Sequence, residues 1–335
     1  MKYDSIELIV QSSEDGTIWD LSNLASSVST SKPIDSSTGK CSFTVNTNVQ
    51  KIRIPMGSTV SLTVTQDGKR KGKFFGYVFT SEPTGKEVKI TAYDQLRYLK
   101  NNETYVLTGS TMEKIIKLIG NDFGLRLGTI EGSGYILPER VEDNKALGDI
   151  IQRAIDFTLQ GTGKQYIIRD EFGYLCCRDV SKLVTNLVVG DVSLLKDYSY
   201  KESIDSDTYN SVKLYKDNED TGKRETYIVM DSNNIKRWGK LQKYESVDEN
   251  MTDAQIREKA QQYLTLYNRV EKTLTLKCEG VIDLEPGNGI YLDITDIPGV
   301  VFRQNALITK IDDTYESGIH TMDLEVRFEW VWLVQ

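Results

Sequence analysis

The sequence is poor in the residues on which most catalytic and metal sites depend. Its 335 residues include one histidine, four cysteines and six prolines. The lone His320 has no accompanying Cys, Ser or Asp motif, which favours a structural turn residue over a catalytic base. No CxxC pair and no zinc-ligand spacing occurs. The vicinal Cys176-Cys177 falls in an expected strand, where the two thiols face opposite sides. We therefore expect buried free thiols, no disulfide, no metal and no cofactor.

Long apolar runs and an excess of basic residues are also missing. No stretch of 18 apolar residues exists, and Met1 to Val10 lacks the basic start and apolar core of a signal peptide. These absences predict a soluble chain made in the cytoplasm. The 49 acidic residues outnumber the 41 basic ones, which argues against a dedicated nucleic-acid binder. The basic run Lys69-Arg70-Lys71 follows the turn dipeptide Asp67-Gly68, so we expect a solvated hairpin tip there.

Two near matches to ligand-binding loops fail at decisive positions. Gly161-Thr162-Gly163-Lys164 resembles the end of a phosphate loop, but Thr158 and Gln165 stand where a Gly and a Ser or Thr are required. A helix stop followed by a strand is the better interpretation. Asp217 to Gly222 resembles the start of a calcium loop, but its twelfth position is Ile228 instead of a bidentate Glu. We expect no site at either place.

Paired carboxylates keep one enzymatic alternative open. Glycoside hydrolysis needs two carboxyl groups about 5–9 Å apart, and a fold with this many acids will contain such a pair. Asp283 with Glu285, and Asp312 with Asp313, are better interpreted as turn acids. No catalytic, cofactor-binding or metal-binding residue is singled out, and we predict that the chain is not an enzyme.

Alternation with a period of two is the main structural signal. From Thr321 to Val334 every even position is apolar, including Trp330 and Trp332, and the odd positions up to Glu329 are polar. This predicts one long β-strand with a buried face. Residues 1 to 105 contain several shorter alternating segments separated by turns, which is typical of a barrel or sandwich.

Helical spacing is confined to three segments. A capping box at Ser110 to Glu113 predicts a helix that ends at Gly120. A second helix is expected from Asn144 to Gly161, followed by a hairpin with strands Gln165–Arg169 and Tyr174–Arg178. A third helix, about 252–268, begins at a capping box of Thr252 and Gln255. Strands resume between the second and third helices, and the two β-rich parts have similar size and strand density, which indicates an internal duplication.

Three segments resemble one known family. They are Tyr93 to Leu99 (YDQLRYL), Gly163 to Gly173 (GKQYIIRDEFG) and Gly318 to Leu324 (GIHTMDL). Together, and in this order, they resemble the baseplate hub proteins of contractile phage tails, of the XkdQ type found in defective prophages and related to the late control protein D group. The resemblance spans nearly the whole chain.

This resemblance implies an α+β, mainly β fold with two tail-tube-like β-barrel domains. The expected division is 1–105 for the first barrel, 106–195 for an α/β insert and 196–335 for the second barrel with its helix, although strands near 183–215 fit the first barrel as well. It further implies a homotrimer that forms a pseudo-sixfold ring between the hexameric tail tube and the trimeric spike. Expected partners are the tube, the spike and other baseplate proteins, with no specific nucleic acid and no membrane insertion. The expected location is the bacterial cytoplasm during assembly and then the baseplate. A cell-wall glycan-binding or glycan-cleaving tail protein is the alternative.

Overall fold

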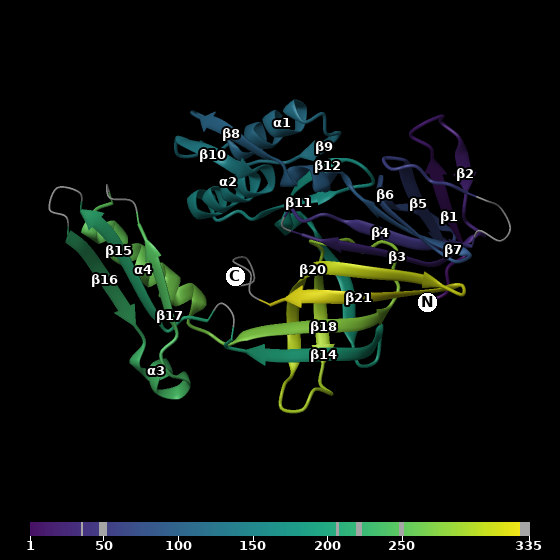
Figure 1. The fold of residues 1–335 in the computed structure, drawn as a ribbon. Helices are drawn as coiled ribbons and strands as arrows, with labels where there is room; N and C mark the ends of the chain where they lie inside the picture. Colours follow the sequence, from purple (N-terminus) through teal and green to yellow (C-terminus); the bar gives the residue numbers. More distant parts are fainter. Residues whose placement is uncertain (35, 47–51, 206–207, 219–222, 248–250, 329–335) are drawn as a thin grey trace. The chain divides into compact units, whose positions relative to one another are not determined.

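The computed structural model describes residues 1–34, 36–46, 52–205, 208–218, 223–247 and 251–328. The chain divides into two compact units (Figure 1), Met1–Ser199 with Leu274–Gln335, and Tyr200–Thr273. We describe each unit separately. In the described residues, the helices are all too short or too polar to cross a membrane.

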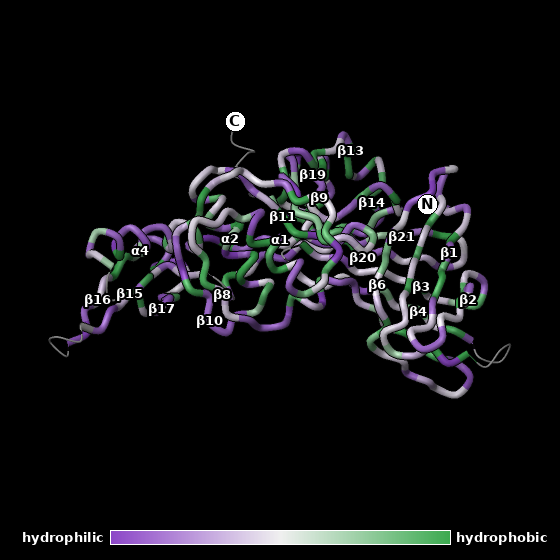
Figure 2. The backbone as a smooth tube through the Cα atoms, turned by 90° about the horizontal axis from the view of Figure 1, so that it is seen from above, coloured by the Kyte–Doolittle hydropathy of each residue, from purple (hydrophilic) through white to green (hydrophobic). Residues whose placement is uncertain are grey.

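The first part of the larger unit is a block of antiparallel strands, here called the first block. Its strands are β1 (Ser5–Gln11), β2 (Ile18–Asp20), β3 (Ala25–Pro33), β4 (Lys40–Asn46), β5 (Thr59–Gln66), β6 (Lys69–Thr84) and β7 (Glu87–Tyr93). They are hydrogen-bonded in the order β3-β4-β7-β6-β5-β1-β2. Alternate residues such as Leu8, Phe43 and Leu62 fill one core, and Figure 2 shows hydrophobic and hydrophilic positions alternating along these strands.

The last part of the chain adds a second block to the same sheet. Its strands are β13 (Val184–Gly190), β14 (Leu195–Ser203), β18 (Glu271–Glu279), β19 (Gly289–Ile294), β20 (Phe302–Glu316) and β21 (Ile319–Arg327). Their order is β14-β18-β21-β20, with β19 on β20 and β13 on β19. β20 also pairs with β3, so the yellow and purple strands lie side by side in Figure 1. The result is one sheet of thirteen strands with open ends in the described residues.

The two blocks share a strand order. The path β3-β4-β7-β6-β5-β1 in the first block matches β14-β18-β21-β20-β19-β13 in the second. Gly57 donates its N–H to the carbonyl of Val78, and Gly287 donates to that of Ile308. Both glycines have positive φ, 77° and 91°, and a register shift follows Val78 and Ile308 alike. One difference is that β1 is antiparallel to β5 whereas β13 is parallel to β19.

Between the blocks lies an insert of short strands and two helices. Its elements are η1 (Gln95–Lys100), β8 (Asn102–Leu107), α1 (Met112–Asp122), β9 (Leu127–Ile130), β10 (Arg140–Ala146), α2 (Leu147–Thr162), β11 (Tyr166–Asp170), β12 (Leu175–Asp179) and η2 (Val180–Lys182). β8 pairs with β10, and β12 lies between β11 and β9. Apolar side chains at helical spacing on α1 and α2 form a core with β11 and β12.

The smaller unit is a three-stranded sheet covered by one helix. It contains β15 (Ser211–Asn218), β16 (Lys223–Met230), α3 (Ser232–Trp238), β17 (Gln242–Ser246) and α4 (Asp253–Tyr267). The strand order is β16-β15-β17. Val212 and Leu214 of β15 pack against Ile256 and Ala260 of α4.

The mainly β, α+β fold class is confirmed, but the sheet is open and does not form closed barrels. The helix at 252–268 begins with the predicted capping box of Thr252 and Gln255. The capping box at Ser110 is wrong, because α1 starts after Thr111 and Ser110 Oγ donates to Thr108 O instead. The short helix α3 was not predicted.

The long terminal strand is confirmed as far as Arg327. In β21, Met322, Leu324 and Val326 are buried and alternate with more exposed polar residues. Residues 329–335, with Trp330 and Trp332, lie outside the described residues.

Candidate functional site: a buried charged junction

Buried charged side chains gather where β3 of the first block pairs with β20 of the second. The pairing runs from Lys310 opposite Pro33 to Tyr315 opposite Val28. We call the cluster around it the charged junction. It consists of Lys32, Gln66, Lys73, Glu285, Asp313 and His320.

Lys73 lies at the centre of the charged junction. Its side chain is 1% exposed, and its ammonium nitrogen lies 3.5 Å from Asp313 Oδ2 and 3.7 Å from Glu285 Oε1. It also donates to the carbonyl oxygens of Ile282 at 3.3 Å and Leu284 at 3.2 Å. Burial lowers the pKa of Lys73, but the two carboxylates outweigh this effect and raise it. The amine is therefore held as a charged hydrogen-bond donor and cannot act as a nucleophile.

A β-bulge places Lys73 inside the protein. Leu62 of β5 is opposite Phe74, whereas Thr63 is opposite Gly72, so Lys73 is the additional residue on β6. Such a bulge changes where a side chain points. Here it allows two successive residues, Lys73 and Phe74, to be buried together. The strict alternation of an unbroken strand would have placed Lys73 on the opposite face.

Asp313 connects the ammonium to the imidazole of His320. Asp313 Oδ1 lies 2.7 Å from His320 Nε2, and His320 Nδ1 lies 3.1 Å from Gln66 Oε1. The imidazole also stacks on Tyr315, with ring centroids 4.5 Å apart. Burial raises the pKa of Asp313, but Lys73 and the His320 hydrogen bond outweigh it and lower the pKa to about 2. Asp313 is thus a buried carboxylate that stays ionised.

Glu285 carries the network on to Lys32. Lys32 Nζ lies 3.1 Å from Glu285 Oε2, and Lys71 Nζ lies 3.5 Å from Glu285 Oε1. Burial raises the pKa of Glu285, but the surrounding ammonium groups outweigh it and lower the pKa. Lys32 occupies an inward position of β3, in step with the buried Val28 and Thr30.

Asp94 and Asp170 form a second buried acidic pair beside Lys32. Asp94 Oδ2 accepts from Gly39 N at 2.9 Å, and Asp170 Oδ1 accepts from Gly173 N at 2.7 Å. Burial raises the pKa of Asp170 to about 6, and burial followed by the charge of Asp170 raises the pKa of Asp94. Asp170 Oδ2 is buried without a hydrogen-bond partner among the described residues.

Gln95 joins two of the segments that carried the family resemblance. Its Nε2 donates to the carbonyl oxygens of Arg126 and Gly173, both at 3.0 Å, and its Oε1 accepts from Arg126 N at 3.0 Å. The YDQLRYL segment is therefore fixed to the end of the GKQYIIRDEFG segment. The GIHTMDL segment supplies His320 to the charged junction.

These contacts indicate a structural joint. The charged groups at its centre are buried and engaged with each other or with backbone, so no nucleophile and base are presented together to a substrate. Among the described residues, no group of three or more His, Cys, Asp or Glu side chains has a metal-binding arrangement.

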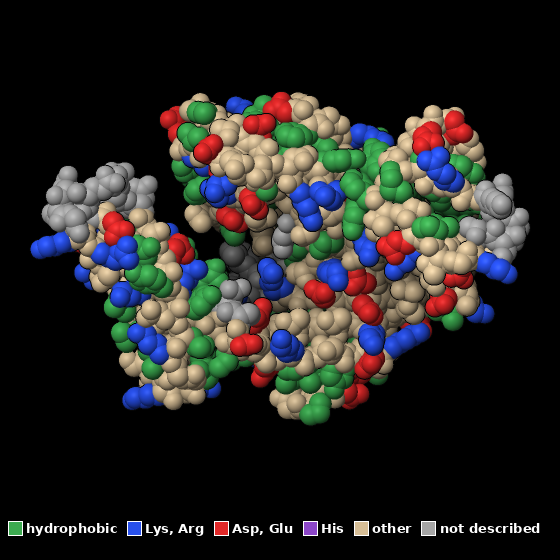
Figure 3. All heavy atoms as spheres, viewed as in Figure 1, with side chains coloured by type: hydrophobic (Ala, Val, Ile, Leu, Met, Phe, Trp, Pro, Cys, Tyr) green, Lys and Arg blue, Asp and Glu red, His purple; other side chains and the backbone are tan. Residues whose placement is uncertain are grey.

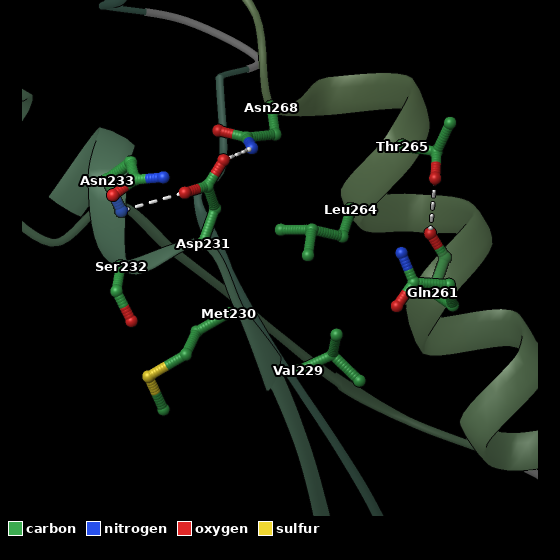
Figure 4. Close-up of a pocket in the computed structure, with 9 residues that line it drawn as sticks. All are labelled: Val229, Met230, Asp231, Ser232, Asn233, Gln261, Leu264, Thr265 and Asn268. Carbon is green, nitrogen blue, oxygen red and sulfur yellow. Dashed lines mark hydrogen bonds between the residues drawn. The ribbon is translucent and has the colours of Figure 1, made fainter.

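A hollow of about 550 Å³ in the smaller unit offers no better chemistry. Its one acidic lining residue, Asp231, accepts from Asn233 N at 2.8 Å and from Asn268 Nδ2 at 2.8 Å. Figure 4 shows the Asp231 carboxylate turned toward these two partners. Asp231 thereby caps the start of α3, and the Asn268 hydrogen bond lowers its pKa.

Two sequence interpretations need correction at the charged junction. Asp312 and Asp313 are not turn acids, since both lie in β20. Asp283 and Glu285 do lie in the loop between β18 and β19, but Glu285, like Asp313, belongs to the buried network. His320 is structural, but it lies in β21 and is fully buried, so it is not a turn residue.

The run Lys69-Arg70-Lys71 begins at a solvated hairpin tip, as expected. Gln66 and Lys69 close the turn at Asp67-Gly68, and the side chains of Lys69 and Arg70 are 71% and 63% exposed. Lys71, one residue further into β6, is 30% exposed and pairs with Glu285. Lys32 and Lys73 were not identified from the sequence. The one available signal for Lys32 is its place on the inward positions of an alternating segment, where an apolar residue is expected. Nothing in the sequence marks the bulge at Lys73.

Two other sequence interpretations are confirmed, the helix stop after the second helix and the buried free thiols. The helix stop lies in the expected Gly161–Lys164 segment, although α2 extends to Thr162, with Gly163 as its cap at φ of 70°, and does not end at Gly161. All four cysteines are free and buried. Asp217 is paired with Arg224 at 2.7 Å, and positions 219–222 of the rejected calcium loop lie outside the described residues. On the face drawn in Figure 3, acidic and basic side chains are interspersed.

A family model now identifies the chain. The model described as YQBQ-like matches residues 28–327. The chain belongs to the YQBQ-like family. Among its relatives, this YQBQ-like chain is 32% identical over 267 residues to the uncharacterized protein YqbQ of Bacillus subtilis (strain 168), covering 79% of this chain and 80% of that protein. It is 28% identical over 270 residues to the phage-like element PBSX protein XkdQ of the same organism, with the same coverage of each.

A solved structure shares the fold of this YQBQ-like chain. It is the 43 kDa tail protein of prophage MuSo2 from Shewanella oneidensis, with a TM-score of 0.68, 14% sequence identity, and coverage of 96% of this chain and 98% of that one. The YQBQ-like chain is therefore similar to structural proteins of phage tails, in agreement with the resemblance found in its sequence.

Proposed function

We propose that the chain is the structural hub of the baseplate in a contractile phage tail or phage-tail-like particle. Three copies form a ring that joins the hexameric tail tube to the trimeric spike, and other baseplate proteins bind around it. The chain is made in the bacterial cytoplasm and ends in the baseplate. The division into 1–105, 106–195 and 196–335 remains a prediction, and within the proposal we shift its second boundary so that β13 (Val184–Gly190), which pairs with β19, belongs to the second block.

The observation that carries the proposal is the repeated strand order within one chain. The first and second blocks follow the same path and lie side by side in one sheet. Three chains would contribute six such blocks, which matches a threefold assembly to a sixfold tube. The relationship to XkdQ and the shared fold of the prophage tail protein support the same role.

The charged junction supports a structural role over an enzymatic one. Lys73, Asp313 and Glu285 are buried at the joint of the blocks, where substrate has no access. Their geometry supports a fixed arrangement of the two blocks. The alternative of a glycan-cleaving tail protein would require an accessible carboxylate pair elsewhere.

The test is the absolute mass of the purified chain by light scattering over a range of concentrations, with negative-stain images of the same fractions. We expect a mass near three times the 38.0 kDa of one chain and ring-shaped particles. Hydrolysis of purified peptidoglycan by the isolated chain would contradict the proposal and favour the glycan-cleaving alternative.

A further inference from the structure

Each block has two segments that could take part in a joint of this kind: one terminal strand, β3 or β14, and the second half of one inner strand, β6 or β20. The joint inside one chain uses β3 and β20 and leaves the other two. β3, at the end of the first block, pairs with the second half of β20 in the second block. By the shared strand order, β3 corresponds to β14, and β20 corresponds to β6. The equivalent second joint would therefore pair β14 with the second half of β6. In the described chain β14 has β18 as its one strand neighbour, and β6 has β5 and β7.

The correspondence between β3 and β14 holds at the level of hydrogen bonds. In the first block Asn46 N donates to Leu24 O, and in the second block Glu279 N donates to Leu194 O. β14 and β18 run antiparallel, as β3 and β4 do. Lys196 forms an ion pair with Glu279 and the following Asp197 forms one with Lys277, so the partners on β18 come in reverse order.

The correspondence between β6 and β20 defines the unused edge. β5 bonds β6 as far as Val78, after which the register shifts and β6 continues with β7 alone. β19 bonds β20 as far as Ile308, after which the register shifts and β20 continues between β21 and β3. The segment of β6 that corresponds to the β3-binding segment of β20 is thus 79–84.

Hydrogen-bond alternation shows which backbone groups this edge presents. The β6–β7 hairpin closes at Thr84 opposite Glu87 with a two-residue turn, and such turns close on a hydrogen-bonded pair. Alternation then turns the backbone groups of Ser81 and Pro83 away from β7. Pro83 has no N–H, so the edge offers the N–H and C=O of Ser81 and the C=O of Pro83. A proline at an edge also hinders indiscriminate strand addition.

We propose that β14 of one copy pairs antiparallel with residues 79–84 of β6 in the next copy, an inference that rests on the proposed hub function. The contact repeats between chains the joint that β3 and β20 make within a chain. The contact is head-to-tail, because it joins two different surfaces of the chain. Such a contact forms a closed ring when the rotation that relates neighbouring copies is a whole fraction of 360°.

Val28 of β3 is opposite Tyr315, one residue before the pair Glu316–Ile319 that closes the β20–β21 hairpin. The same count from Leu194 on β14 and from the closing pair Thr84–Glu87 on β6 places Asp197 opposite Thr84.

A disulfide between these two positions tests the pairing. The variants are Thr84→Cys, Asp197→Cys and the double variant, each oxidised and run on a non-reducing gel, with the light-scattering mass measured on the same samples. The native cysteines are buried and give little background. We expect the double variant to yield covalent species up to three chains, an equal mixture of the two single variants to yield dimers, and each single variant alone to stay uncross-linked.

The control pair is Asp197→Cys with Glu7→Cys, which places an exposed cysteine on β1 instead of β6 and should not cross-link. Cross-linking of Thr84→Cys alone as efficient as in the double variant would show a symmetric contact and overturn the head-to-tail pairing. A mass of three chains without the disulfide would overturn the strand pairing and leave the hub function standing. A mass of one chain at every concentration, without a cross-link, would overturn both.

A second pair of variants tests the backbone of the edge directly. Ser81→Pro removes the one outward N–H of the segment without removing a bond to β7, whereas Ser81→Ala keeps it. We expect Ser81→Pro to weaken self-association at least tenfold and Ser81→Ala to leave it unchanged, with both variants giving the parent's circular dichroism. Equal association of the two variants would contradict the pairing. If Ser81→Pro fails to fold, the disulfide experiment still decides.

Discussion

The buried face of α1 consists of Met112, Ile115, Ile116 and Ile119, whereas the buried face of β20 at the joint carries Asp313. The insert is thus held by apolar contacts that depend on area and packing, and they tolerate substitutions of similar volume. The charged junction depends on a few atoms in fixed positions, and loss of one member leaves another buried charge without a partner. The insert core provides stability, while the charged junction specifies how the two blocks are joined.

The largest expected effect is at the charged junction. Asp313→Ala leaves the Lys73 ammonium and the His320 ring without their shared carboxylate, and should lower the free energy of unfolding by about 3–5 kcal/mol. Urea unfolding followed by circular dichroism measures it. The matched control is Asp312→Ala, whose carboxylate is 38% exposed and paired with Lys310, with an expected loss under about 1 kcal/mol. Equal losses for the two variants would mean that the junction is not specific.

The insert core should show a slightly smaller, purely packing effect. Ile116→Ala removes buried methyl groups and should cost about 2–4 kcal/mol in the same urea assay. Leu118→Ala, at a position 42% exposed on the same helix, should cost less than about 1 kcal/mol. Repeating the assay in sodium chloride separates apolar from charged contacts. Added salt should leave the loss of unfolding free energy caused by Ile116→Ala unchanged. A strong salt dependence of that loss would argue against an apolar core.

The acidic pair beside the junction predicts a dependence of stability on pH. The pKa of Asp170 is raised to about 6, so the folded state binds more protons than the unfolded state between pH 4 and 6, and stability falls as the pH rises through this range. The Lys32 ammonium partly offsets the repulsion that the Asp170 carboxylate experiences from Asp94 and Glu285. Asp170→Asn should remove this fall and stabilise the chain by up to about 3 kcal/mol above pH 6. An unchanged slope of unfolding free energy against pH between 4 and 6 would show that Asp170 is not its source.

The smallest of the four effects concerns the contact of η1 with the rest of the insert. Gln95→Ala removes three hydrogen bonds to the backbone of Arg126 and Gly173 and should cost about 1–2 kcal/mol. Gln152→Ala, whose amide bonds the exposed Asp156 on α2, is the control and should be close to neutral. Hydrogen exchange should locate the loosened amides near Arg126 and Gly173. Loosening confined to α2 instead would place the link elsewhere.

Elements defined by local chemistry could be predicted from the sequence. The capping box at Thr252, the helix stop at Gly163 and the alternation of Met322, Leu324 and Val326 each depend on residues close in the chain. The joint of β3 with β20 could not be predicted, because it brings together strands at opposite ends of the sequence. The internal duplication was indicated by strand density, but its alignment required the paired hydrogen bonds of Gly57 and Gly287.

The site was less predictable than the fold. Lys73 is buried because of a bulge, and a period-two pattern has no means of indicating one additional residue. The sequence favours a turn at Asp312-Asp313, yet Asp313 lies in β20, where the distant Lys73 stabilises its carboxylate. His320 was recognised as structural, but its partners Gln66 and Asp313 come from different blocks.

The pairing of β3 with β20 also constrains the order in which the chain can fold during its synthesis. Thr30 and Asp313, which meet in this joint, are 283 residues apart. At typical translation rates the ribosome needs roughly 15–60 s to traverse that distance, so the nascent first block waits with the edge of β3 uncovered. The inward-pointing Lys32 places a charge on that edge, a feature that discourages wrong strand partners. Closure of the sheet must then be a late folding event, slowed by the long loop between its two strands.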